Sequence, residues 1–196
     1  MYNWRKINDT EKCKVMKYRK MQKLPWHCPP HFEGSGLYHL TAANYEHKII
    51  IGKDFERMQQ FENELLSFLE SENTVKAWCI LPNHYHLLID VEDLKKTLSN
   101  LGKFHGKLSF LWNKEEDKQG RKCWHGVADR KIRNADHYYA TLNYIHHNPV
   151  KHKYVRKWND WKYSSAKQFL EEVGKESALK LWIQYPVLDY GKGWDD

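Results

Sequence analysis

Two apolar runs joined by a Pro-Asn break, over residues 77–90, constrain this chain more than any other stretch. The sequence there reads AWCILPNHYHLLID. Both runs have the length and composition of strands, and the break between them has the chemistry of a turn. Side chains two residues apart on a strand point to the same face, so His84 and His86 would present their imidazoles side by side. Two neutral imidazoles so placed can chelate one divalent cation; alternatively, one or both are ordinary half-buried histidines.

A second candidate cluster lies further along the chain, in residues 138–149, which read YYATLNYIHHNP. The apolar spacing predicts a helix, and Pro149 disfavours helical backbone at Asn148, so the helix is expected to end there. Tyr144 and Asn148 are four residues apart and would share one helix face. An amide oxygen suits a hard cation, and a phenol can attack phosphorus once a metal polarises the phosphate. Alternatively, Tyr144 is a packed core residue and Asn148 merely ends the helix.

The remaining hydrophobic patterns predict a β-α-β-β-α-β order. Strands are expected over residues 38–45, 75–81, 86–91 and 123–132, with helices over 55–71 and 94–112. This order is the split βαβ arrangement of ferredoxin-like α+β folds, which have an antiparallel sheet. The helix that carries Tyr144 follows the last strand. We therefore predict a ferredoxin-like domain with an added tyrosine-bearing helix.

Helical segments are also expected outside this core, over residues 11–22, 166–173 and 177–183. We interpret residues 1–33 as an N-terminal arm packed on the domain, residues 34–173 as the domain itself, and residues 174–196 as a C-terminal extension. Repeats and low-complexity segments are absent from the sequence, which favours one domain with extensions at this length.

The two candidate segments, taken together, resemble a known family. Residues 81–89 (LPNHYHLLI) are similar to the His-hydrophobic-His motif of single-strand DNA transposases that use one catalytic tyrosine. Residues 143–152 (NYIHHNPVKH) resemble the tyrosine segment of the REP-associated tyrosine transposases. The resemblance continues through residues 129–133 (DRKIR) and 161–165 (WKYSS) and covers roughly residues 37 to 170. Either motif alone is weak, but both in this order and spacing are specific.

The resemblance implies a site and an activity. His84, His86 and Asn148 would bind one Mg²⁺ or Mn²⁺, and Tyr144 would be the nucleophile that forms a covalent 5′-phosphotyrosine. The implied function is a metal-dependent endonuclease and strand transferase for single-stranded DNA, acting on hairpin-associated repeats. The chain departs from the family at the middle of the histidine motif, which is usually aliphatic. Tyr85 stands there and supplies a second, rival tyrosine.

The charge of the chain favours an anionic partner. It carries 32 basic against 25 acidic residues, a formal net charge of +7, and this balance suits nucleic acid. Its 9 Trp and 12 Tyr would suit base stacking along a single strand, although core packing accounts for most aromatic residues. The candidate DNA contacts are Lys96, Lys103, Lys107, Arg130, Arg133 and Lys151. Alternatively, these are solvated surface charges.

The sequence also gives expectations about compartment and assembly. It contains no stretch long enough for a membrane span and opens with polar residues, so we expect a cytoplasmic protein that does not contact membranes. The four cysteines lack paired spacing and are expected to be free thiols, although His27-Cys28 with His31, or Cys123 with His125, could be half of a zinc site. The resemblance leaves both monomer and homodimer open.

Other functions compete with this interpretation. RNA-binding domains use the same strand and helix order, but this chain lacks their characteristic string of aromatic residues. A catalytically silent, sequence-specific nucleic-acid-binding protein is the main alternative. A metal hydrolase that activates water directly would make Tyr144 dispensable. Cleavage with covalent trapping of the DNA separates these alternatives.

Overall fold

The computed structural model describes residues 8–21 and 34–187, and the chain divides into two compact units, Met1–Phe32 and Glu33–Asp196. The described part of the first unit is one helix, α1 (Asp9–Met21). The helix begins with a reciprocal cap, because Asn8 Oδ1 accepts from the Glu11 amide at 2.9 Å and the Glu11 carboxylate accepts from the Asn8 amide at 3.1 Å. The expected packing of an arm over residues 1–33 and the division at residue 174 stay predictions.

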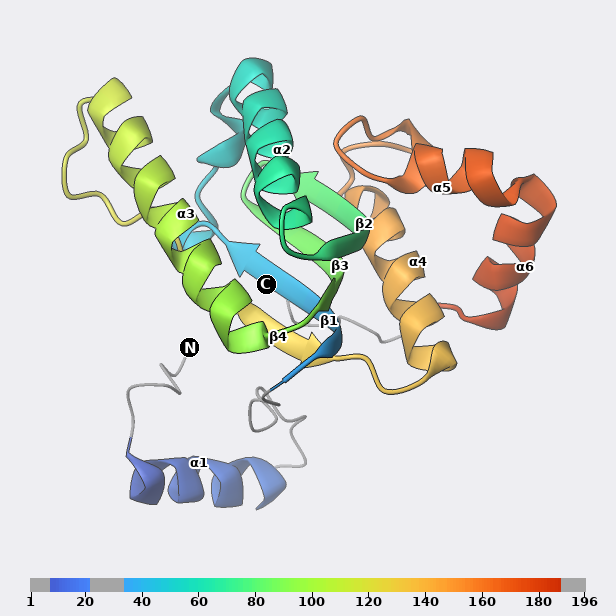
Figure 1. Ribbon diagram of the computed structural model, residues 1–196, viewed down its shortest axis with the longest axis horizontal. Helices are drawn as coiled ribbons and strands as arrows, with labels where there is room; N and C mark the ends of the chain where they lie inside the picture. The colour runs from blue at the N-terminus through green and yellow to red at the C-terminus, as the bar shows by residue number, and fades with distance from the viewer. Residues whose placement is uncertain (1–7, 22–33, 188–196) are drawn as a thin grey trace. The chain divides into compact units, whose positions relative to one another are not determined.

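The second unit contains a four-stranded sheet with helices on both faces. Its elements are β1 (Gly36–Ala43), α2 (Phe55–Glu70), β2 (Thr74–Leu81), β3 (His84–Val91), α3 (Leu94–Glu115), β4 (Ala128–Lys131), α4 (Ala135–Lys151), α5 (Ala166–Val173) and α6 (Lys175–Gln184), with short 3₁₀ turns at Tyr45–His47, Ile51–Lys53 and Trp158–Asp160. The strand order is β2-β3-β1-β4 and every neighbouring pair is antiparallel. The predicted α+β, ferredoxin-like fold is confirmed (Figure 1).

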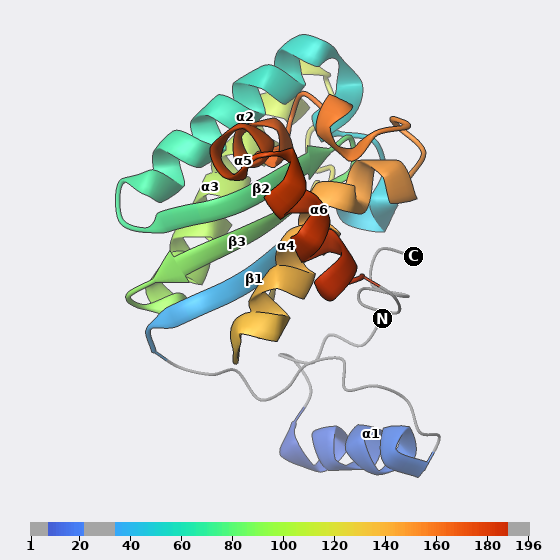
Figure 2. The ribbon, with the colours of Figure 1, turned by 90° about the vertical axis from the view of Figure 1, so that its right-hand side faces the viewer.

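The two faces of the sheet have different coverings. Helices α2 and α3 lie on one face, and α4 lies on the other with α5 and α6 beyond it (Figures 1 and 2). The α2–α3 side holds the larger core, which includes stacked and tilted aromatic rings. The α4 side is built on small or slender residues of the sheet, Ala77, Cys79, Leu81 and Leu88. Such short side chains let α4 lie close to the sheet.

Caps and apolar spacing explain where α2 and α3 begin. Asp54 Oδ1 accepts from the Arg57 amide at 2.7 Å, and Asp93 accepts from the Lys96 amide at 3.0 Å. Each cap satisfies one of the amides that a helix leaves without a partner, and is worth about 1 kcal/mol. The buried residues of each helix follow helical spacing and face the sheet.

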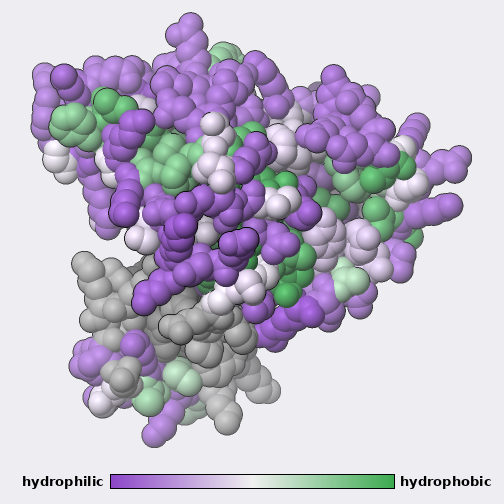
Figure 3. Space-filling view, viewed as in Figure 1, coloured by the Kyte–Doolittle hydropathy of each residue, from purple (hydrophilic) through white to green (hydrophobic). Residues whose placement is uncertain are grey.

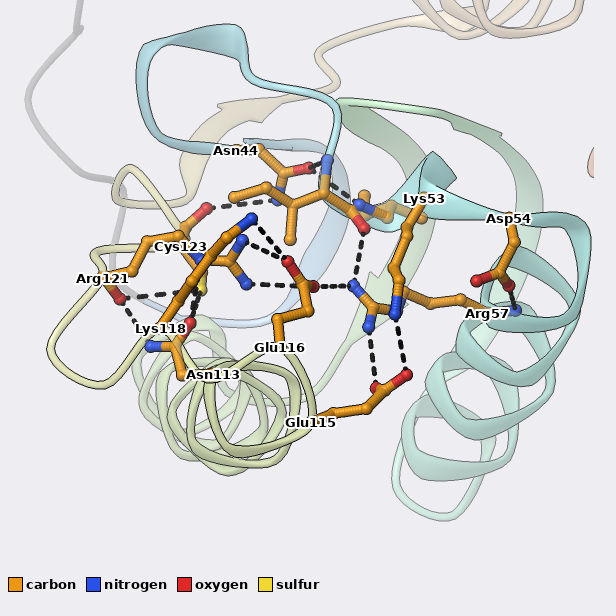
Figure 4. A network of polar contacts seen from close by, with 12 residues as sticks. Asn44, Lys53, Asp54, Arg57, Asn113, Glu115, Glu116, Lys118, Arg121 and Cys123 are labelled. Atoms are coloured by element: carbon orange, nitrogen blue, oxygen red, sulfur yellow. Dashed lines mark hydrogen bonds and ion pairs between the residues drawn. The ribbon is translucent and has the colours of Figure 1, made fainter.

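A network of ion pairs joins the start of α2 to the end of α3 (Figure 4). The Arg57 side chain is only 5% exposed and contacts the carboxylates of Glu115 and Glu116. Glu116 also contacts Arg121 at 2.7 Å, in the loop that leads to β4. The hydrogen bond from Arg121, with those from Arg57 and Lys118, lowers the pKa of the Glu116 carboxyl far below its usual range. This carboxylate therefore stays ionised throughout the physiological range.

The turn between β2 and β3 fixes where β3 begins. Leu81 pairs with His84 across a two-residue turn, as the Pro-Asn break predicts. The Gly52 amide donates to Pro82 O at 2.8 Å, and a Cβ at Gly52 would lie 2.3 Å from Pro82 Cβ, so only glycine fits. The Asn44 amide donates to the Asn83 carbonyl at 2.7 Å. The turn is therefore anchored on both sides.

The predicted end of the tyrosine helix is wrong. Pro149 lies inside α4, which continues to Lys151 instead of ending at Asn148. Proline lacks an N–H and disfavours helical backbone before it, but this cost is limited in the last turn of a helix. Asn148 is 1% exposed and Pro149 is also buried, so packing on the sheet outweighs the local preference.

The fourth strand is shorter than the predicted range 123–132. Regular pairing covers Ala128–Lys131, and an isolated bridge joins Trp124 to Asn44. The intervening chain still runs beside β1, because the His125 amide donates to Ala43 O at 2.9 Å. Trp124 is buried against the aromatic core, which interrupts the regular alternation of a strand.

The surface seen in Figure 3 is mostly hydrophilic, with smaller apolar patches. One of these lies over α6, where Leu179 and Ile183 are exposed. Across residues 8–21 and 34–187, every helix is too short or too polar for a bilayer span.

Candidate active site

The two motif histidines lie side by side on the sheet face that α4 covers. The rings of His84 and His86 are 5.0 Å apart between centroids and meet edge to face. Both side chains are buried, at 2% and 0% exposure. The prediction that they share one face is confirmed, because both begin β3 and strand alternation sends them the same way.

Hydrogen bonds determine which ring nitrogen of His84 carries the proton and which one faces Asn148. Asn83 donates its Nδ2 to His47 O at 3.1 Å, so its Oδ1 is the atom that faces His84 Nδ1, at 2.8 Å. This oxygen can only accept, so Nδ1 carries the proton and Nε2 keeps its lone pair. Nε2 lies 3.3 Å from Asn148 Oδ1. Two electron-donating atoms therefore face each other at about the separation of neighbouring ligands around a cation with bonds of about 2.1 Å.

His86 is oriented from β1. Its Nδ1 lies 2.9 Å from Thr41 Oγ1 and 3.2 Å from His39 Nε2. Thr41 pairs directly with His86 across the strands, and His39 is two residues away on the same face. Because Nδ1 is used in this way, His86 would bind a metal through Nε2. Hydrogen bonds of this type hold metal-binding imidazoles in one orientation.

Helix α4 brings the tyrosine to the histidines. The Tyr144 ring centroid lies 5.2 Å from that of His86 and 5.8 Å from that of His39. Asn148 lies one turn further along α4, and both side chains are 1% exposed. The Lys151 ammonium lies 5.3 Å from the centroid of the Tyr144 ring. The four residues expected at the site are thus brought together in one buried cluster.

His39 was missed by the reasoning from sequence. It is 2% exposed and contacts both His86 and Tyr144. Its alternation with Thr41 in the first strand is a signal that could have been used, because it places two polar side chains on one face of a core strand.

Tyr85 lies on the opposite face, as strand alternation predicts. It is fully buried in the aromatic core, and its hydroxyl lies 3.0 Å from His105 Nε2. Burial raises the pKa of the Tyr85 phenol far above its usual range. Tyr85 is therefore a poor nucleophile and lies on the wrong side of the sheet for one.

Two of the predicted DNA contacts lie near the first turn of α4. Arg130 pairs with His39 across β1 and β4, so its side chain leaves the sheet on the same face. Arg133 follows β4 and is exposed. Burial lowers the pKa of His137 in α4, and the charges of Arg130 and Arg133 lower it further. Both guanidinium groups therefore lie close enough to the start of the tyrosine helix to disfavour a proton on His137.

The lysines of α3 do not join this cluster. Lys96, Lys103 and Lys107 are exposed, but α3 covers the other face of the sheet. Lys96 also pairs with Glu72 at 3.0 Å. Their role in DNA binding stays a prediction, and any strand they contact would have to pass around the edge of the sheet.

The donor set fits a hard divalent cation. Two imidazole nitrogens and an amide oxygen suit Mg²⁺ or Mn²⁺, and Mn²⁺ accepts imidazole at least as readily. Within residues 8–21 and 34–187 there is no group of three His, Cys, Asp or Glu side chains that could bind a metal, so a third protein ligand beside His84 and His86 would have to be of another type, such as Asn148. Cys13 and Cys123 are free thiols. The described residues contain no larger His, Cys, Asp or Glu cluster that the half zinc site at Cys123 could complete. Cys28 lies outside the described residues.

The chain is similar to known proteins in sequence and in fold. No protein-family model matches the chain. A curated Haemophilus influenzae protein named "Putative REP-associated tyrosine transposase" is 31% identical over 132 residues, covering 54% of this chain and 69% of that protein. A solved structure of a REP-associated tyrosine transposase bound to a REP hairpin matches with a TM-score of 0.57 at 18% identity, covering 76% of this chain and 86% of that one. The extent of the sequence match shows that the chain belongs to the family of REP-associated tyrosine transposases.

Proposed function

We propose that the protein is a metal-dependent endonuclease and strand transferase for single-stranded DNA. The observation that carries this proposal is the convergence of Tyr144 and Asn148 from α4 with His84 and His86 from β3. The solved relative is bound to a REP hairpin, which supports a hairpin-forming DNA as substrate. One chain supplies all four side chains, so a second copy is not needed to complete the site.

His84 and His86 through Nε2, and Asn148 through Oδ1, would hold the Mg²⁺ or Mn²⁺. A bound divalent cation would withdraw charge from the scissile phosphate and help to orient it. Tyr144 Oη would attack the phosphorus, so that an O–P bond forms while the bond from phosphorus to the 3′ oxygen breaks. The phenolic proton is lost and the departing 3′ oxygen gains one. The products are a 5′-phosphotyrosine and a 3′-hydroxyl. A second 3′-hydroxyl can then attack the phosphorus of the phosphotyrosine, which rejoins DNA and releases Tyr144 without ATP.

Charged side chains support the placement of a phosphate near Tyr144. Lys151 is exposed, and its ammonium lies over the tyrosine ring. Arg130 leaves β4 on the same sheet face. Both would contribute positive charge where the transition state gains negative charge.

The cluster is closed to solvent in the arrangement described, because its four side chains are between 0% and 2% exposed. A phosphate therefore reaches Tyr144 Oη only after neighbouring side chains move. The same burial favours a second candidate function, a DNA-binding protein that has lost cleavage. The two candidates differ in whether a covalent adduct forms.

Replacement of each tyrosine tests the proposal. Tyr144→Phe should abolish cleavage and covalent adduct but retain DNA binding, because only the nucleophilic oxygen is removed. Tyr85→Phe should cleave at near the normal rate, because Tyr85 lies on the other face of the sheet. The measurement is denaturing electrophoresis of each variant with a labelled single-stranded hairpin substrate and Mn²⁺.

Three outcomes separate the candidates. An adduct that survives Tyr144→Phe but not Tyr85→Phe would contradict the assignment of the nucleophile. Cleavage by both variants without any adduct would indicate that water is the nucleophile. Binding without cleavage by the unmodified protein would favour the silent DNA-binding protein.

A further inference from the structure

Helix α4 ends in a tight backbone motif that places one aromatic side chain. The Tyr154 amide donates to Pro149 O at 2.9 Å, and the Lys153 amide donates to Val150 O at 3.0 Å. Lys153 has a φ of 61°, the left-handed conformation that glycine usually supplies at this position. A non-glycine residue is strained here, so the turn is retained at some cost. The motif ties Tyr154 to the helix that carries Tyr144.

Aromatic rings connect this position to the candidate metal site. The ring of His152 lies 5.0 Å from that of His84, and the ring of Tyr154 lies 6.5 Å from that of His152. Trp161 lies 5.3 Å beyond Tyr154 and is held in place, because its Nε1 donates to Ile80 O at 2.8 Å. Tyr154 is 41% exposed, whereas His152 and Trp161 are half-buried. Tyr154 is therefore the most exposed ring of this series.

The segment that carries this exposed ring is rich in cationic residues. Residues 151–162 contain a single acidic residue, Asp160. The exposed basic side chains of this segment are Lys151, Lys153, Arg156, Lys157 and Lys162. An exposed aromatic ring among cations suits single-stranded nucleic acid, because the bases stack on the ring while the cations follow the phosphates. An apolar protein partner would require a larger apolar patch and fewer charges.

We propose that Tyr154 is a stacking platform for a base of the single strand that passes His84 and Tyr144. The inference rests on the proposed function, because it takes the strand to be DNA held at that site. It adds a residue that binds substrate without touching the reacting atoms. Because the stacking residue and the nucleophile belong to one helix and its terminal motif, binding of the base would also set the position of the phosphate.

Photocrosslinking tests the proposal directly. Single strands carrying 5-iodouracil at successive positions near the cleavage site would be irradiated in complex with Tyr144→Phe, which keeps the substrate intact. Mass spectrometry should then find a crosslink at Tyr154 for one or two adjacent positions. Crosslinks that map only to other residues would overturn the proposal. This arm needs no change at Tyr154, so its result does not depend on how a substitution there affects folding.

Binding measurements by fluorescence anisotropy form the second arm, in the same Tyr144→Phe background. Tyr154→Ala should weaken binding by about 5-fold to 100-fold, the usual loss when one stacked base is removed. Tyr154→Trp should restore it. Lys153→Gly should keep the turn and lose less DNA affinity than Tyr154→Ala. It should also lower the salt dependence of DNA binding by the amount expected for about one phosphate contact. Phe55→Ala is the matched control, because Phe55 is 80% exposed at the start of α2 and should bind as before.

The outcomes distinguish this inference from the proposed function. If Tyr154→Ala binds as tightly as Phe55→Ala, or Tyr154→Trp fails to restore binding, the stacking role is wrong even though cleavage by the unmodified protein proceeds. If binding depends on Tyr154 but the unmodified protein forms no adduct, the inference holds and the proposed chemistry is wrong. If the protein does not bind single strands at all, both are wrong.

Discussion

Mild acid should destabilise this fold through two histidines that are buried in the neutral form. His105 is 5% exposed, stacks on Trp124 at 4.1 Å and lies 3.0 Å from the Tyr85 hydroxyl. His146 is 3% exposed, and its Nε2 lies 2.9 Å from Ser165 Oγ. Burial lowers the pKa of each imidazole to about 3. Neither site offers a carboxylate within hydrogen-bonding distance among the contacts described, so a proton would be costly in both.

The sign and size of the effect follow from proton linkage. The unfolded chain binds a proton at each histidine below a pKa of about 6.5, whereas the folded chain does so only near 3. The stability from each neutral imidazole is therefore complete above about pH 6.5 and is lost as the pH falls toward about 3. Between about pH 7.5 and pH 5 each histidine should cost about 2 kcal/mol, or about 4 kcal/mol for the pair.

Urea unfolding, followed by tryptophan fluorescence at several pH values, measures this effect. The double variant His105→Phe with Tyr85→Phe removes one titrating group and its buried partner together, which avoids leaving either polar atom unsatisfied. The difference in unfolding free energy between about pH 7.5 and pH 5 should be smaller by about 2 kcal/mol in the double variant. His125, His137 and His147 also have a lowered pKa and contribute equally to both proteins. An unchanged acid dependence would refute the assignment of a buried neutral imidazole to His105.

Two further predictions concern the α2–α3 network and the metal site. Glu116→Gln should destabilise the protein by about 1–3 kcal/mol, because it removes the negative charge of a carboxylate that pairs with the buried Arg57 guanidinium. Glu115→Gln should cost less than about 1 kcal/mol, because the Glu115 carboxylate is 55% exposed. Urea unfolding of the two variants measures the contrast, and equal losses would contradict it. Replacement of His84 and His86 by alanine should abolish Mn²⁺ binding in calorimetry and Mn²⁺-dependent cleavage, while most DNA affinity remains because phosphate contacts supply it. Retained Mn²⁺ binding would exclude these histidines as ligands.

The sequence was sufficient to predict which residues lie together within each of the two motifs, because these relations are local. A strand period of two places His84 and His86 together, and a helix period of 3.6 places Tyr144 and Asn148 together. The alternating pattern also predicts that Tyr85 faces the other way. Only the family resemblance implied that the residues of β3 and α4 lie together, because no local pattern specifies which face of the sheet α4 covers.

Other features depend on tertiary contacts that local patterns do not contain. The helical position of Pro149 reflects burial of the last turn of α4, which outweighs a local preference against it. The role of His39 depends on the register between β1 and β3, which brings Thr41 opposite His86. The place of Tyr154 depends on a left-handed residue at Lys153, where the sequence offers no glycine as a signal.

The unusual tyrosine in the histidine motif is explained by the two-sided sheet. A residue between two candidate ligands on a strand faces away from them, so its identity is set by the core and not by the candidate metal site. A tyrosine in that core must find a partner for its hydroxyl, and His105 supplies one. The two residues are therefore coupled. Tyr85→Phe alone would leave His105 Nε2 buried without this partner, at a cost of about 1–3 kcal/mol.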